Sequence, residues 1–229
     1  MLQSFQKEQS QLIFVRYFST DERLIFAVGD APSAGLNSAF VARFIGNLFH
    51  SVVTAHGDGD LGQILNILNS RIDQYPSFER VTMQCASIDP ARGILRLANA
   101  GHPYPVLYQA RRGKCDILLV RGMLLNDSLA PIHRRETFEQ YHLEICPQDV
   151  LVLVSDGLTE GHLLKGHPYG YQFRKIVEES AGLSAKRIGE RILDNWRARD
   201  RKEDSGDDVS LIVVRVEEGK THLLRGPQC

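Results

Sequence analysis

The sequence lacks several features that would place the protein outside the ordinary globular class. No apolar run approaches the roughly 20 residues needed to cross a bilayer, and segment 1–10 is polar, without the apolar core of a signal peptide. The four cysteines are scattered, which argues against a zinc site and does not suggest a disulfide framework. The formal net charge is only −1, so nothing favours nucleic acid or anionic lipid. These absences predict a cytoplasmic protein that binds neither nucleic acid nor membrane.

The order of the hydrophobic patterns indicates an α+β fold. Apolar residues recur every four positions from Leu36 to Val52 and again along one face of 61–72, which predicts two consecutive helices. Helical spacing returns around 171–179 and 185–197. β-branched and aliphatic runs predict strands at 11–18, 23–28, 80–88, 93–99, 105–109, 115–120, 136–145, 150–155 and 209–216. Strands grouped between helical pairs favour sheet packed on sheet with helices outside. We expect a single domain over 1–229, with a core from about 11 to 216.

Aspartates stand at the ends of three of these apolar strands. Asp30 and Asp156 each follow a strand, and Asp207 precedes the last one. Magnesium and manganese prefer oxygen ligands, and rigid strand ends that meet at one edge of a sheet pair could supply them. An ion held there could activate a water for attack on phosphorus. An aspartate after a strand also commonly begins a turn or caps a helix, so each acid alone has that second interpretation.

Five stretches, in order along the chain, resemble the SpoIIE/RsbU-type branch of the metal-dependent protein phosphatase 2C family. They are Gly29–Phe40, Val81–Met83, Ala100–Pro105, Ser155–Glu160 and Asp207–Leu211. The resemblance runs from about 11 to 216. It implies a four-layer α-β-β-α sandwich, a centre of Mn²⁺ or Mg²⁺, and hydrolysis of phosphoserine or phosphothreonine on a protein. Bacterial substrates of this family are often small anti-sigma-factor antagonists, so the resemblance implies a role in signalling such as a stress response.

The resemblance also assigns candidate site residues. Asp30 matches the acid that bridges two metal ions, and Ala31 would offer its backbone carbonyl. Asp156 and Asp207 match the remaining ligands of one ion, which makes Asp30, Asp156 and Asp207 the candidate catalytic acids. Asp208 matches a second acid of the last motif, where direct ligation is less expected. His102 lies in the Ala-Gly-His-Pro turn, which this family is usually taken to use structurally, although histidine suits acid–base chemistry.

The chain departs from the family pattern on its first long strand. Family members usually carry another acid there, and 11–18 contains none. The turn after Asp30 is altered too, with Pro32 and Ser33 where Ser-Gly is usual. Two ions, one of them weakly held, are therefore expected. The alternatives to a phosphatase are a degenerate pseudophosphatase that acts as a binding module, and an unrelated magnesium-dependent hydrolase.

Other residues have structural interpretations. Phe40, Phe44, Phe49 and Trp196 stand at helical spacing and are expected in the core. His162 and His167 follow Asp156 and are only weakly supported as ligands. The helices that flank the predicted site could mediate a homodimer.

Overall fold

The computed structural model describes residues 2–6, 13–19, 23–31, 36–56, 60–75, 80–126, 138–160, 169–199 and 209–217. Asp207, Asp208, His162 and His167 lie outside these residues, so the predictions that concern them rest on sequence. Within the described part of the chain, no helix combines the length and the apolar character that crossing a bilayer requires.

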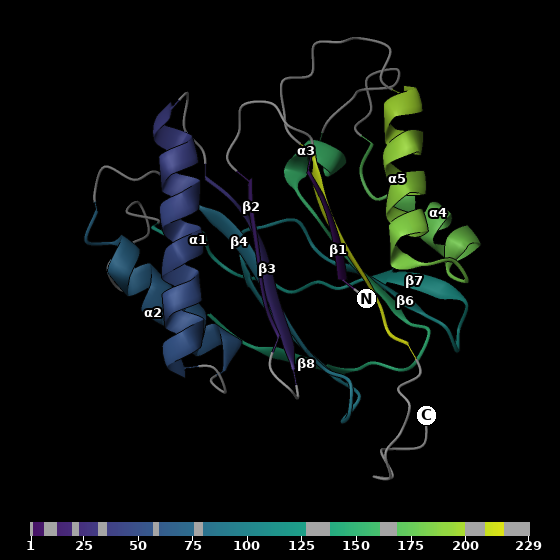
Figure 1. Ribbon diagram of the computed structural model, residues 1–229, viewed down its shortest axis with the longest axis horizontal. Helices are drawn as coiled ribbons and strands as arrows, with labels where there is room; N and C mark the ends of the chain where they lie inside the picture. Colours follow the sequence, from purple (N-terminus) through teal and green to yellow (C-terminus); the bar gives the residue numbers. More distant parts are fainter. Residues whose placement is uncertain are drawn as a thin grey trace.

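Two antiparallel sheets form the centre of the fold (Figure 1). Sheet A contains, in spatial order, β1 (Leu2–Gln6), β10 (Ser210–Arg215), β9 (Val150–Val154), β6 (Val106–Gln109) and β7 (Lys114–Ile117). Sheet B contains β2 (Ile13–Ser19), β3 (Leu24–Asp30), β4 (Thr82–Asp89), β5 (Ile94–Ala100) and β8 (Tyr141–Glu144). All pairings within the two sheets are antiparallel.

Helices cover the outer face of each sheet. The pair α1 (Leu36–His56) and α2 (Leu61–Ile72) packs on sheet B, while α4 (Phe173–Ser180) and α5 (Ala185–Arg199) pack on sheet A. A single-turn helix, α3 (Asp156–Thr159), follows β9. The expected α-β-β-α sandwich and the α+β class are therefore confirmed.

Three apolar cores hold these layers together. One lies between α1, α2 and sheet B, a second between sheet A, α4 and α5, and a third between the two sheets. Strand residues alternate between cores, as the period of two requires. On β4, for example, Met83 and Cys85 face the helices, whereas Ala86 and Ile88 face sheet A. The central strands β3, β9 and β10 are therefore buried on both faces, which explains their nearly continuous apolar sequences.

The expectation that Phe40 belongs to the core was wrong. Its side chain is 64% exposed, whereas Phe49 and Trp196 are buried and Phe44 is half-buried. Positions four apart advance about 40° further around a helix at each step, because 3.6 residues complete one turn. Along the four-residue series the side chains therefore turn toward sheet B, from the exposed Phe40 through the half-buried Phe44 to the buried Val52. Phe40 stacks on Phe44 instead, with ring centroids 6.3 Å apart.

Two short elements and one covalent link were not predicted. β1 pairs with β10 along the edge of sheet A, although segment 1–10 is polar. α3 has only four residues, too few for a hydrophobic period to show. Cys85 and Cys115 are free, but Cys146 is disulfide-bonded, which the scattered cysteine spacing did not indicate.

Candidate metal centre

Asp30 and Asp156 lie at the ends of central strands in the two sheets. Asp30 is the last residue of β3, and Asp156 begins α3 two residues after β9 ends. Both side chains are half-buried, and Ala31 is buried. α3 and the N-terminal end of α1 lie at the same end of the molecule (Figure 1). This is the end at which the sequence predicts a metal site.

A chain of contacts connects the two aspartates across the sandwich. Asp30 pairs with Thr82 in the β3–β4 register, and Thr82 Oγ1 lies 2.8 Å from His102 Nδ1 in a hydrogen bond. The backbone of Val154, two residues before Asp156, contributes to the pKa of the His102 ring. His102 therefore connects sheet B to the end of β9, two residues before Asp156.

The turn that carries His102 is held by one buried side chain. Asn99 Oδ1 accepts a hydrogen bond from the His102 backbone N–H at 2.9 Å, and Asn99 Nδ2 donates to the carbonyls of His102 and Val120 at 2.9 and 2.7 Å. Gly101 has a φ of 66°, a conformation that side-chain-bearing residues rarely adopt. Gly122 lies so close that a Cβ there would overlap the Asn99 carbonyl oxygen. The conformation of the turn therefore depends on the identities of Asn99, Gly101 and Gly122.

His102 is locked as a neutral ring. Burial lowers its pKa from 6.5 to about 3, although the backbone of Val154 acts in the opposite direction. A ring that does not form the imidazolium ion near neutral pH cannot act as a cationic general acid, so the structure favours the structural interpretation of this histidine over acid catalysis.

This burial predicts a pH dependence of stability. The unfolded chain binds a proton at His102 below pH 6.5, while the folded chain keeps the ring neutral to about pH 3. The free energy of unfolding should therefore fall as pH is lowered through this window, by up to about 1.4 kcal/mol per pH unit from this group. Urea titrations in EDTA between pH 7 and 4 would measure it. In His102→Asn the free energy of unfolding should depend less on pH, by the contribution of this one group. An unchanged pH dependence would show that His102 is not its cause.

The layer between the sheets is polar at this end. Gln84 is fully buried beside Asn99 in the β4–β5 register, and on its strand it shares the face of Ala86, which belongs to the inter-sheet core. Both polar atoms of the Gln84 amide and Ser210 Oγ are buried and have no hydrogen-bond partner among the described residues. Buried polar atoms of this kind usually bond to ordered water.

The chemistry of the predicted donors fits a hard cation. The predicted donors within the described residues are the carboxylates of Asp30 and Asp156 and the backbone carbonyl of Ala31, all oxygen ligands of the type that Mg²⁺ and Mn²⁺ prefer. No group of three or more His, Cys, Asp or Glu side chains that could hold an ion occurs within the described residues. Asp207, the third predicted acid, is outside them. The structure thus relates Asp30 to Asp156 and leaves Asp207 as a prediction.

Sequence reasoning missed the residues that support this edge. Asn99, Thr82 and Gln84 carry no metal-ligand signature, and their roles come from contacts between distant strands. One available signal was the polar Asn99 and Gln84 within otherwise apolar strands, since buried polar side chains need a partner.

Comparison with known protein families gives a match over most of the chain. The family model described as Stage II sporulation protein E (SpoIIE) matches residues 20–217. A curated relative, "Phosphoserine phosphatase RsbU" of Bacillus subtilis (strain 168), is 26% identical over 155 residues, which cover 67% of this chain. The match spans only 44% of the length of RsbU.

Solved structures share the fold. The SiaA-PP2C domain of Pseudomonas aeruginosa superposes with a TM-score of 0.80 at 15% identity, covering 93% of this chain and 85% of that domain. RsbX, solved in complex with magnesium, gives a TM-score of 0.66 at 14% identity, with 93% and 92% of the two chains covered. At such identities the likeness concerns the fold alone.

Proposed function

Because this chain belongs to the SpoIIE family of protein serine/threonine phosphatases, we propose that it hydrolyses phosphoserine or phosphothreonine on a small bacterial signalling protein. The observation that carries the proposal is the placement of Asp30 and Asp156 at one end of the sandwich, connected through Thr82 and His102. If each aspartate only began a turn or capped a helix, there would be no reason for a second aspartate at the same end of the opposite sheet.

The proposed ligands are Asp30, Ala31, Asp156 and Asp207. When bound, Mn²⁺ or Mg²⁺ supplies charge neutralisation at the phosphate and activates the attacking water. The protein's part is to hold oxygen donors rigidly. Asp30 does so from a strand paired on both sides, and the carboxylate of Asp156 accepts its neighbour Gly157's N–H at 2.7 Å. Asp207 is proposed as a ligand on the basis of its sequence motif alone.

One ion is expected to be held more weakly than the other. The register places Ile13 of β2 opposite Asp30, and β2 contains no acidic residue. A second ion beside Asp30 would therefore lack the carboxylate that the family usually provides on this strand. This observation favours the second candidate function, a pseudophosphatase that binds a phosphoprotein without turnover.

Manganese-dependent turnover separates the two functions. The wild-type protein should hydrolyse an aryl phosphate in manganese and lose that activity in EDTA. Carboxylates and phosphate are both negatively charged, so without the cation the site has nothing to attract the phosphate. Calorimetric titration should show one tighter and one weaker site. If neither an aryl phosphate nor a phosphoserine peptide is hydrolysed although manganese binds, the pseudophosphatase function is correct.

The partners are inferred from the family. The likeness to RsbU, a phosphoserine phosphatase, supports a substrate that carries phosphoserine. A phosphorylated anti-sigma-factor antagonist, within a pathway such as a stress response, is the substrate that the family resemblance implies. We place the protein in the cytoplasm, as one domain, and propose that the helices flanking the site form a homodimer. Sedimentation at several concentrations would test the last point.

A further inference from the structure

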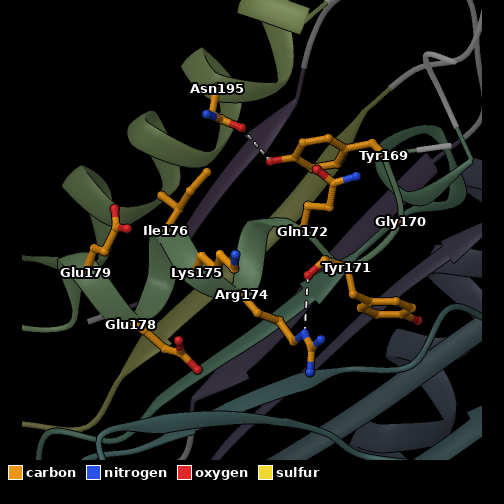
Figure 2. A pocket seen from close by; sticks show the side chains of 10 residues that line it. All are labelled: Tyr169, Gly170, Tyr171, Gln172, Arg174, Lys175, Ile176, Glu178, Glu179 and Asn195. Carbon is orange, nitrogen blue, oxygen red and sulfur yellow. Dashed lines mark hydrogen bonds between the residues drawn. The ribbon is translucent and has the colours of Figure 1, made fainter. Parts of the chain in front are cut away.

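A cavity of about 790 Å³ opens beside α4 (Figure 2). The segment 169–172 and α4 form most of its wall, and Asn195 of α5 completes it. Tyr169 and Asn195 lie together on one side, where the tyrosine hydroxyl donates to Asn195 Oδ1 at 3.1 Å. The candidate metal ligands within the described residues, Asp30, Ala31 and Asp156, do not line this cavity.

The rim of the cavity is tied to the candidate metal centre at two points. Gly170 donates its N–H to the carbonyl of Thr159 at 2.8 Å, and Thr159 ends the helical turn that Asp156 begins. The Tyr171 hydroxyl accepts the N–H of Tyr104 at 2.8 Å, within the turn that follows His102. The helical turn from Asp156 to Thr159 rises only about 4.5 Å. The distance from Asp156 to the edge of the cavity is therefore one that a few residues of an extended peptide can span.

Two cations and two carboxylates line the cavity. Among the described residues, the Arg174 side chain makes one hydrogen bond, from Nε to the Tyr171 carbonyl at 3.3 Å, which leaves its two Nη groups available. Lys175 is exposed, and its ammonium group has no hydrogen bond or ion pair to any described residue. The carboxylates have partners: Glu178 accepts the Cys115 N–H at 2.8 Å, and Glu179 lies 4.0 Å from Arg191.

We infer that this cavity binds an acidic side chain of the phosphoprotein substrate, a few residues from the phosphoserine. The inference rests on the proposed function and adds the substrate class. The two Nη groups of an arginine form a fork that matches a carboxylate, and a neighbouring lysine adds a second positive charge. The half-buried Tyr171 and Ile176 offer apolar surface for the rest of the peptide. The site therefore selects substrates by the sequence around the phosphoserine.

Two matched peptides test the inference. One carries glutamates three and four residues from a phosphoserine on both sides, and the other carries glutamines there. The wild-type protein should prefer the acidic peptide about tenfold in kcat/KM, the effect of one charge-assisted pair. The double variant Arg174→Gln/Lys175→Gln should reduce that ratio to about one. Lys175→Gln alone should reduce it partly, and because this side chain is exposed, folding is not at risk.

Lys186→Gln is the matched control. Lys186 is an exposed α5 cation outside the cavity lining, and it pairs with Glu190 at 3.9 Å. This variant should keep the wild-type ratio. Equal rates for both peptides with the wild type, an unchanged ratio in the double variant, or the same loss in Lys186→Gln would each overturn the inference.

A failure of the proposed phosphatase activity can be distinguished from a failure of the proposed acidic-peptide site. If the wild-type protein hydrolyses no phosphate ester in manganese, the proposed function fails. Fluorescence anisotropy with the labelled peptides then tests the cavity by itself. Tighter binding of the acidic peptide, lost in the double variant, would support the inference, and equal binding of both peptides would overturn it.

Discussion

Asp156→Asn should reduce manganese-dependent hydrolysis of an aryl phosphate by about a hundredfold or more, the range expected when a group that stabilises transition-state charge is lost. Asparagine has nearly the same shape but no negative charge, so it weakens the hold on a cation without opening a cavity. The thermal unfolding midpoint measured in EDTA should stay close to that of the wild type. The rate measured over a series of manganese concentrations gives both the loss of affinity and the loss of turnover.

Asp116→Asn provides the matched control for this experiment. Asp116 is a partly exposed residue of β7, at the edge of sheet A, and its ion pair is with Arg112. Removing its charge should leave the rate within a factor of about two, since an exposed ion pair contributes little. Equal activities of Asp156→Asn and wild type would refute the assignment of Asp156 as a metal ligand.

The largest loss of stability should come from Asn99→Ala. This change removes the partner of three buried backbone groups at once, namely the N–H and carbonyl of His102 and the carbonyl of Val120. A buried polar group left without a partner costs about 1 to 3 kcal/mol. We expect the free energy of unfolding to fall by about 3 to 5 kcal/mol in urea titrations, since the three penalties do not add fully.

Asn47→Ala is the corresponding control on α1. Asn47 is exposed and makes no hydrogen bond through its side chain to any described residue. Its replacement should change the free energy of unfolding by about 0.5 kcal/mol or less. A similar small effect for Asn99→Ala would mean that water replaces the amide in the turn, and the assignment of Asn99 as the residue that fixes His102 would then be wrong.

Most of the fold was predictable because its strands and helices are long and strongly patterned. The continuous apolar sequence of β9 and the nearly continuous one of β10 indicated strands buried on both faces, which a sheet-on-sheet arrangement requires. The apolar stripe of α2 predicted the side chains that pack on sheet B. The position of Phe40 was not predictable from its spacing alone, since a series of four-residue steps drifts around the helix.

The candidate site was predictable only in part. Asp30 and Asp156 stood out because an acid directly after an apolar run is conspicuous, and the family motifs gave both a role. The supporting residues gave no such signal. Thr82 and His102 are 20 positions apart in sequence, and their hydrogen bond depends on the pairing of β4 with β5 and on the turn after β5. Such contacts between strands leave no periodic trace in the chain.

The sequence by itself determined which segments form strands and helices, and which acids are suited to bind a hard cation. These properties depend on local periodicity and on side-chain chemistry, which any single segment carries. Only the tertiary structure decided that the ends of β3 and β9 are connected through His102, that this ring is buried and neutral, and that a cavity with available cations lies beside Asp156's helix. These features arise from packing between segments far apart in the chain, where burial changes pKa values and fixes hydrogen bonds that no local pattern encodes.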